Sequence, residues 1–118
     1  LNGHAPVELW GTGTPKREFL HVDDLGRAVL FALENKLDEH LYNVGTGVDL
    51  TIKELAMLVQ SAVGHQGAIN WDSSKPDGTP RKLLDSSKLH KNGWKHRINL
   101  INGILSTYKS FQNEKASR

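Results

Sequence analysis

Two short stretches carry the residues best suited to hold an anion, and both read Gly-Thr-Pro followed by two cations. The first is Gly13-Thr14-Pro15-Lys16-Arg17 and the second is Gly78-Thr79-Pro80-Arg81-Lys82. Pro76 and Asp77 lead into the second stretch and favour a tight turn, because proline presets φ and Asp caps its own backbone. Such a turn would present its cations to an anion while Asp77 accepts from a polar ring or hydroxyl. The spacing alone leaves two solvated surface turns equally open.

The composition indicates one mildly basic globular domain. The chain has 118 residues, a net charge of +2 and a pI near 9.0, which permit a phosphate-bearing ligand and do not call for nucleic acid. The hydrophobic content of 37% supports a modest core, so we do not expect disorder. There is no cysteine, which excludes disulfides and thiolate chemistry and fits a reducing compartment. No apolar run reaches bilayer-spanning length, so we expect no membrane partner.

The hydrophobic periodicity predicts an α/β fold of about three main helices and four short strands. The strands are expected over residues 7–10, 17–22, 41–44 and 68–71. The first two would pair as a hairpin with a loop of about five residues, which would leave Trp10 and Arg17 near the same rim. Residues 113–118 are polar and are expected to fray.

Capping residues predict where the helices begin and end. The first helix, to Asn35, would be capped by Asp23 or Asp24, and the second would carry a Thr51–Glu54 capping box and stop at Gly64. The remaining expectations are Asp85 as the cap of a short helix over 86–91, Trp94 as a core residue and Asn99 as the cap of the last helix.

Several patterns that could carry chemistry are incomplete. Gly45-Thr46-Gly47 lies between a strand and a helix, but the third glycine of a dinucleotide fingerprint would fall on Leu50. We therefore interpret it as a backbone turn. His21 beside Asp23 is either an acid–base pair or, as we favour, a hydrogen-bonded residue at a helix cap. The six histidines lack metal-ligand spacing, and a nucleophile elbow and a stacking platform for single-stranded nucleic acid are absent from the sequence.

Four blocks, in order, resemble the extended short-chain dehydrogenase/reductases that act on nucleotide sugars. They are Trp10–Asp24, Asn43–Gly47, the Lys75–Asp85 stretch Lys-Pro-Asp-Gly-Thr-Pro-Arg-Lys-Leu-Leu-Asp, and Asp85 to Trp94 with the final helix. The Lys75–Asp85 block narrows the resemblance to the GDP-L-fucose synthase family, the NADPH-dependent 3,5-epimerase/4-reductases of GDP-4-keto-6-deoxymannose.

The resemblance covers only the C-terminal third of those enzymes. It implies a nucleotide-sugar-binding domain over residues 1–112, with 113–118 as a polar tail and 41–44 as a strand that completes the upstream Rossmann sheet. The family's NADP fingerprint and its catalytic Ser, Tyr-x-x-x-Lys, Cys and His would lie upstream. No Tyr-x-x-x-Lys and no Cys occur here, so we expect no catalytic residue, cofactor site or activity in this chain alone. NADP(H), a homodimer and a cytoplasmic location are implied for the full-length enzyme.

What the resemblance transfers to this chain is substrate binding, through Trp10, Arg17, Asp77 and Lys82. Arg17 is expected on the diphosphate, because a planar guanidinium suits that group. Asp77 would accept from the guanine N–H groups or a sugar hydroxyl. Lys82 is favoured over Arg81, since successive side chains of an extended segment alternate. The structural alternatives are that Trp10 belongs to the core and that Arg17 pairs with Glu18 or Asp23.

Two other functions stay open beside this one. The first is a different nucleotide-sugar epimerase or dehydratase, such as one acting on UDP-galactose, which the Lys75–Lys82 block disfavours. The second is a stand-alone, non-catalytic binding module. Under the favoured interpretation, the apolar face that would meet a Rossmann sheet is uncovered here, so we expect self-association or marginal stability.

Overall fold

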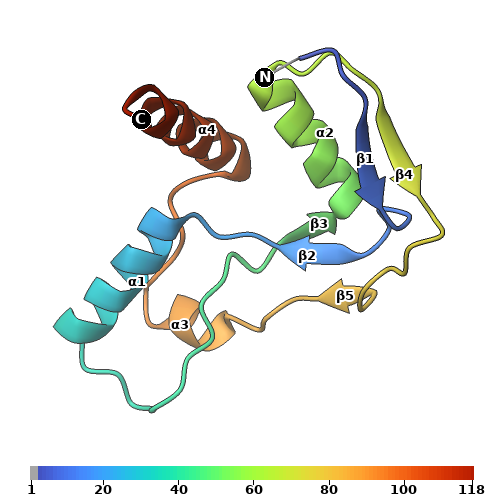
Figure 1. Ribbon diagram of the computed structural model, residues 1–118. Coiled ribbons are helices and arrows are strands. Elements are labelled where there is room, and N and C mark those ends of the chain that lie inside the picture. Colours follow the sequence, from blue (N-terminus) through green and yellow to red (C-terminus); the bar gives the residue numbers. More distant parts are fainter. Residues whose placement is uncertain (1–2) are drawn as a thin grey trace.

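The computed structural model describes residues 3–118, so the first two residues of the expected domain lie outside the described part. Figure 1 shows the helices and strands along the chain. Their bounds are β1 Val7–Trp10, β2 Lys16–Glu18, α1 Val22–Glu34, β3 Asp49–Thr51, α2 Ile52–Val63, β4 Ile69–Asp72, β5 Arg81–Lys82, α3 Ser87–Lys91 and α4 Leu100–Ala116. The expected α/β class is confirmed.

The strands form two small sheets rather than the predicted hairpin. β1 pairs in parallel with β4, whereas β2 lies between β3 and β5, antiparallel to the first and parallel to the second. The turn after β1 leaves toward α2, where the carbonyls of Gly13 and Pro15 accept from the N–H groups of Lys53 and Ile52, both at 2.9 Å. The first N–H groups of a helix have no acceptor within the helix. The carbonyls of the turn supply these acceptors at the start of α2, which favours a turn that leads toward α2 over one that closes a hairpin between β1 and β2.

The helix caps agree with the sequence except at α1 and α3. Thr51 and Asn99 cap α2 and α4, and Gly64 ends α2 with a φ of 71°. The N-cap of α3 is Ser86, so the prediction of Asp85 as its cap is wrong, although Asp85 Oδ1 accepts from Ser87 N at 3.0 Å. At α1 the cap is His21, whose Nδ1 accepts from Asp23 N at 3.0 Å. The prediction of Asp23 or Asp24 as the cap is therefore wrong.

Two expected chain segments differ in the structure. Residues 41–44 form no strand, because no strand among residues 3–118 lies beside them to complete a ladder. Tyr42 and Val44 instead pack against the small core. The last helix continues through Ala116, so most of the expected polar tail is helical.

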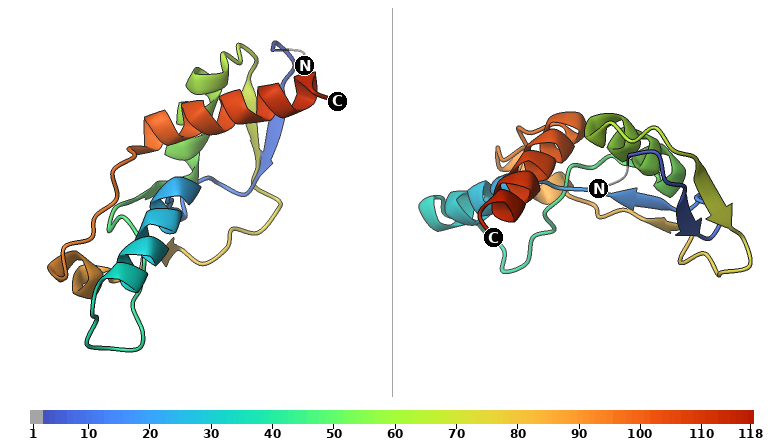
Figure 2. Two further views of the ribbon diagram at one scale, coloured as in Figure 1. Left: turned by 90° about the vertical axis from the view of Figure 1, so that its left-hand side faces the viewer. Right: turned by 45° about the horizontal axis from the view of Figure 1, so that its top comes forward.

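The buried core of the described residues is small and lies between α1 and α3. It consists of Ala28, Leu89 and Trp94, with four partly buried apolar residues packed on it. Trp94 is thus a core residue, as predicted. The molecule is flat, with extents of 51 × 38 × 20 Å (Figure 2). Its radius of gyration of 17.2 Å exceeds the roughly 13.5 Å expected of a compact chain of this length.

Large apolar side chains are consequently left on the surface. α1 presents a stripe of five of them, with exposed fractions from 47% to 80%: Val22, Leu25, Val29, Leu30 and Leu33. Apolar residues of α2, α4 and β1 also line an open cleft of about 740 Å³. This much exposed apolar surface favours association.

We predict that the chain self-associates through the α1 stripe. The double variant Val29→Lys, Leu33→Lys should shift sedimentation toward monomer without lowering the thermal midpoint, because both side chains contribute little to the core. Glu34→Lys, on the same helix, is the matched control and should leave association unchanged. A wild-type chain that sediments as a stable monomer at all concentrations would contradict this prediction.

Candidate functional site

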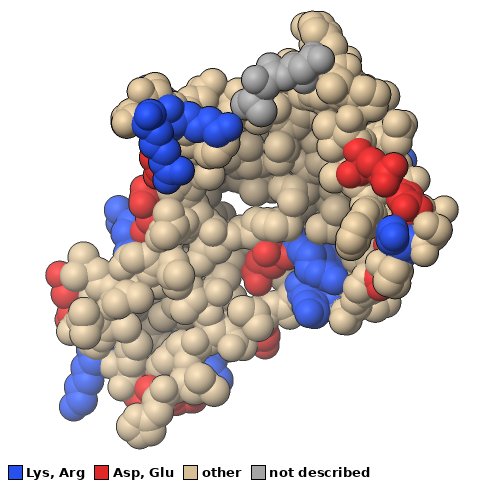
Figure 3. All heavy atoms as spheres, viewed as in Figure 1, with Lys and Arg blue, Asp and Glu red and all other residues tan. Residues whose placement is uncertain are grey.

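Arg17 and Lys82 lie side by side on one face of the three-stranded sheet. The parallel register of β2 and β5 pairs Lys16 with Arg81 and Arg17 with Lys82. Residues paired in register project to the same face, and successive residues alternate. Two cations are therefore adjacent on the face that carries Leu50 of β3. Figure 3 shows blue Lys and Arg atoms gathered over this part of the molecule.

Arg81 points to the opposite face and is already paired. Its Nε donates to Asp49 Oδ2 at 2.7 Å, and the Asp49 side chain is only 9% exposed. The hydrogen bond from Arg81 outweighs burial and lowers the pKa of Asp49. Lys82 has no ion pair within residues 3–118. Of the two cations on β5, Lys82 is the one available to a ligand.

The guanidinium of Arg17 faces the loop between β4 and β5. A Cβ at Gly78 would lie 3.0 Å from Arg17 Nη2, so glycine at this position gives the guanidinium room close to the loop. Arg17 Nη1 donates to the carbonyl of Lys16 at 2.7 Å. No carboxylate of the described residues forms an ion pair with it, so the alternative pairing with Glu18 or Asp23 is wrong.

Asp77 joins this loop to the turn after β1. Its Oδ1 accepts from Thr12 N at 2.8 Å and its Oδ2 from Thr12 Oγ1 at 2.7 Å. These bonds favour the ionised carboxylate and lower the pKa of Asp77. Gly11, with a φ of 87°, has no room for a side chain there, because a Cβ would lie 2.4 Å from Asp77 Oδ1.

Trp10 stands at the end of β1, next to this turn. Its exposed fraction is 71%, so the alternative that it belongs to the core is wrong. Lys75 Nζ lies 5.1 Å from the centroid of the Trp10 ring, a cation–π distance. Thr12, two residues after Trp10, hydrogen-bonds Asp77, and Gly78, next to Asp77, lies against the Arg17 guanidinium. Lys82 is paired with Arg17 in the register of β2 and β5. We call the surface formed by the end of β1, by β2 and β5, and by the β4–β5 loop the rim.

The carboxylate of Glu18 stabilises the Gly45–Gly47 turn. The sequence did not predict this role for Glu18. Its Oε2 accepts from Gly47 N at 2.6 Å, and its Oε1 accepts from Leu84 N at 3.4 Å. A Cβ at Gly45 would lie 2.6 Å from this carboxylate. The turn therefore binds an anion supplied by its own chain. Because Glu18 occupies the Gly47 N–H and fills the space beside Gly45, these residues do not fit a dinucleotide phosphate.

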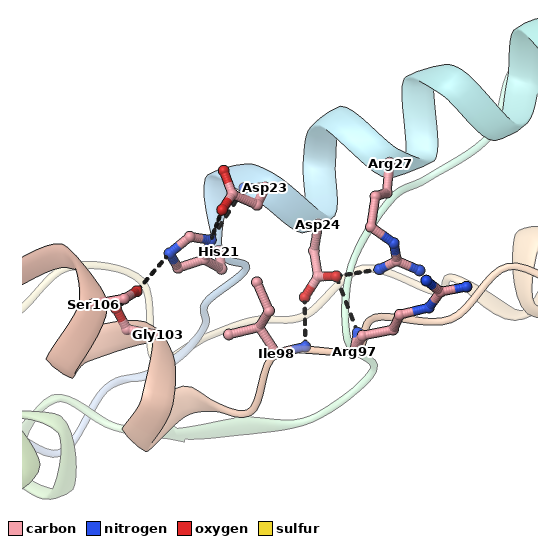
Figure 4. Close-up of polar contacts among 8 residues, drawn as sticks. All are labelled: His21, Asp23, Asp24, Arg27, Arg97, Ile98, Gly103 and Ser106. Atoms are coloured by element: carbon pink, nitrogen blue, oxygen red, sulfur yellow. Dashed lines mark hydrogen bonds and ion pairs between the residues drawn. The ribbon is translucent and has the colours of Figure 1, made fainter.

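Asp24 is the second carboxylate whose role the sequence did not reveal. It is fully buried, forms an ion pair with Arg27, and accepts from the N–H groups of Arg97 and Ile98, both at 3.0 Å (Figure 4). Burial raises the pKa of Asp24, but the bonds from Arg27 and the two N–H groups outweigh it, so the pKa is lowered. Asp24 thereby fixes α1 to the segment that leads into α4.

His21 forms a structural link, as the favoured interpretation predicted. Its Nδ1 accepts from Asp23 N, and its Nε2 lies 3.0 Å from Ser106 Oγ of α4 (Figure 4). Ser106 Oγ in turn donates to the carbonyl of Gly103 at 3.1 Å. Since the Ser106 proton is used there, His21 Nε2 is the donor of their shared bond. Both ring nitrogens are thus occupied by structural bonds.

The described residues show neither a metal site nor a membrane span. No group of three or more acidic or His side chains among residues 3–118 is placed to hold a metal ion. In the same range, none of the helices combines the length and the apolar character needed to cross a bilayer.

Comparison with known proteins shows what this chain is similar to. The model of the NAD dependent epimerase/dehydratase family matches residues 1–45. The probable GDP-L-fucose synthase 1 of Oryza sativa is 57% identical over 105 residues, which are 89% of this chain and 32% of that protein. The chain is homologous to part of the GDP-L-fucose synthases.

Solved structures of two GDP-sugar reductases share the fold of this chain. A GDP-6-OMe-4-keto-L-xylo-heptose reductase from C. jejuni is 38% identical, with a TM-score of 0.85 over 92% of this chain and 34% of that one. A GDP-mannoheptose C4 reductase from Campylobacter jejuni, solved with NADP bound, is 39% identical, with a TM-score of 0.78 over 91% of this chain and 35% of that one. The chain therefore spans about a third of the length of the relatives it matches.

We predict that Asp24 makes stability depend on pH. Because its folded pKa lies below the ordinary value of 3.8, its contribution is present above that value and is lost as the pH falls through the folded pKa. Asp24→Asn should lower the free energy of unfolding by about 2 kcal/mol at neutral pH, and the difference from wild type should shrink in acid.

Urea unfolding at a series of pH values measures this dependence. Asp38→Asn, at an exposed position, is the control and should stay within about 0.5 kcal/mol of wild type throughout. A deficit for Asp24→Asn that stays unchanged as the pH falls below 3.8 would show that the carboxylate charge is not the cause.

Proposed function

We propose that this chain is the nucleotide-sugar-binding part of an NADPH-dependent GDP-L-fucose synthase. The observation that carries the proposal is the register of β2 and β5, which brings Arg17 and Lys82 together on one face. Two adjacent cations suit a diphosphate, and a guanidinium can bind its oxygens with two parallel hydrogen bonds. The homology to GDP-L-fucose synthases supports a GDP-sugar as the bearer of that diphosphate.

The other rim residues would hold the remaining parts of the ligand. Trp10 offers an exposed ring as an apolar wall. Asp77 keeps acceptor capacity beyond its two bonds to Thr12, because each carboxylate oxygen has two lone pairs. It would accept from the guanine N–H groups or from a sugar hydroxyl. In this account the four residues orient the nucleotide sugar, and positioning by itself can supply a large part of a rate enhancement.

The chemistry of the full enzyme would come from residues outside this chain. Hydride transfer needs NADPH, which supplies the electrons when bound. This chain contains neither Tyr-x-x-x-Lys nor Cys, and its Gly45–Gly47 turn is occupied by Glu18. We therefore derive no cofactor contact or proton transfer from its residues, and we expect the chain alone to be inactive. The full-length enzyme would act as a homodimer in the cytoplasm.

We predict that GDP-mannose binds this chain more tightly than UDP-galactose does, as calorimetric titration would measure. Arg17→Ala and Lys82→Ala should each weaken GDP-mannose binding by about tenfold, since a charge-assisted hydrogen bond is worth about 1.5–3 kcal/mol. Arg17→Lys should recover only part of the loss, because Lys cannot bind bidentately.

Arg81→Ala is the matched control, because it removes a neighbouring cation that faces Asp49 instead. It should change the affinity by less than about twofold. Equal affinities for the two nucleotide sugars would favour a different nucleotide-sugar epimerase or dehydratase. No binding of either would favour a non-catalytic module and contradict the proposed function.

A further inference from the structure

Thr12 lies at the centre of a directional hydrogen-bond chain between the two loops of the rim. Its hydroxyl proton goes to Asp77 Oδ2 at 2.7 Å. A hydroxyl has a single proton, so the contact of 2.8 Å between Thr12 Oγ1 and Thr14 Oγ1 must be donated by Thr14. Thr14 N also donates to Thr12 Oγ1, at 3.3 Å. The donors thus run from Thr14 through Thr12 to the carboxylate.

Among residues 3–118, Thr12–Asp77 is the one side-chain pair that hydrogen-bonds across these loops. The partners are 65 positions apart in the sequence, and Thr12 supplies both its N–H and its hydroxyl. The other tie nearby is the backbone bond from Lys16 N to the carbonyl of Pro80, at 2.9 Å. Thr12 therefore sets how the carboxylate of Asp77 is turned relative to Arg17.

Thr12 itself points its polar groups at Asp77 and Thr14, so it offers no free donor to a ligand. A carboxylate held by two donors from one residue keeps a single orientation, and its unused lone pairs then have fixed directions. The close approach of Asp77 to Gly11 adds a steric limit to this orientation. These contacts suit a residue that acts on the ligand through its neighbour.

We propose that Thr12 is a positioning residue of the nucleotide-sugar site, acting through Asp77. It orients the Asp77 carboxylate and holds the Lys75–Lys82 loop against the turn after β1. This inference rests on the proposed function for the identity of the ligand. Its first consequence is that the hydrogen bonds from Thr12 set the orientation and pKa of the Asp77 carboxylate. This consequence concerns the free protein and can be measured without any ligand.

The ligand-free test is an NMR titration of the Asp77 carboxylate in the wild type, Thr12→Val, Thr12→Ser and Thr107→Val. The bonds from Thr12 lower the pKa of Asp77. Thr12→Val removes the hydroxyl donor, so the pKa should move up toward its ordinary value, whereas Thr12→Ser keeps the donor and should leave it lowered. Thr107→Val makes the same chemical change on α4 and should have no effect. An unchanged pKa in Thr12→Val overturns the proposal.

The ligand test is a calorimetric titration of the same variants with GDP-mannose. Thr12→Val should weaken binding by about fivefold, the equivalent of one hydrogen bond of about 1 kcal/mol, and Thr12→Ser should restore it. Asp77→Asn should weaken binding as well, and the double variant should bind no more weakly than Asp77→Asn alone. Additive losses, or an unaltered affinity in Thr12→Val, overturn the positioning role and leave the proposed function standing.

A wild-type chain that binds no GDP-mannose would count against the proposed function itself. The carboxylate titration would still decide whether Thr12 orients Asp77, so the two failures are distinguishable.

Discussion

The parallel pairing of β2 with β5 is the constraint on which the rest of the rim depends. It joins segments more than 60 positions apart and fixes which cation of each pair lies on the sheet face that carries Leu50. With Arg17 and Lys82 on one face, Lys16 and Arg81 must occupy the other, where Asp49 meets Arg81. A shift of one residue in this register would exchange the two sets, so the β4–β5 loop must have a fixed length and path. The bonds between Thr12 and Asp77 hold that path from the opposite end.

Carboxylates, more than apolar burial, organise the loops of this chain. The described core contains three buried apolar residues, too few to position every segment. Asp24, Glu18 and Asp77 each accept from backbone N–H groups of distant segments. Charge-assisted bonds of this kind are stronger than neutral ones and are directional, so they determine orientation where packing does not. The chain therefore keeps a defined rim although much of its apolar surface is exposed.

Local signals in the sequence predicted local structure well. Thr51 and Asn99 cap their helices and Gly64 ends α2, as their residue types predict. The alternation of side chains along an extended segment correctly predicted that Lys82 and Arg81 lie on opposite faces of the sheet. Pairing between distant strands could not be predicted, because the partners of β1 and β2 lie across intervening helices and turns. The segment 41–44 reads as a strand from its residue types, yet a strand also needs a neighbour. Glu18 and Asp24 were missed because a carboxylate that binds backbone groups carries no pattern of its own.

We propose that Trp10, Arg17, Asp77 and Lys82 surround one nucleotide-sugar site. The amide and indole NMR spectrum of the chain, titrated with GDP-mannose, tests this arrangement. The Trp10 indole and the amides of residues 11–17 and 75–82 should shift together along one saturation curve, while the buried Trp94 indole stays in place. Shifts confined to the apolar cleft between α2 and α4, with the rim unmoved, would contradict it.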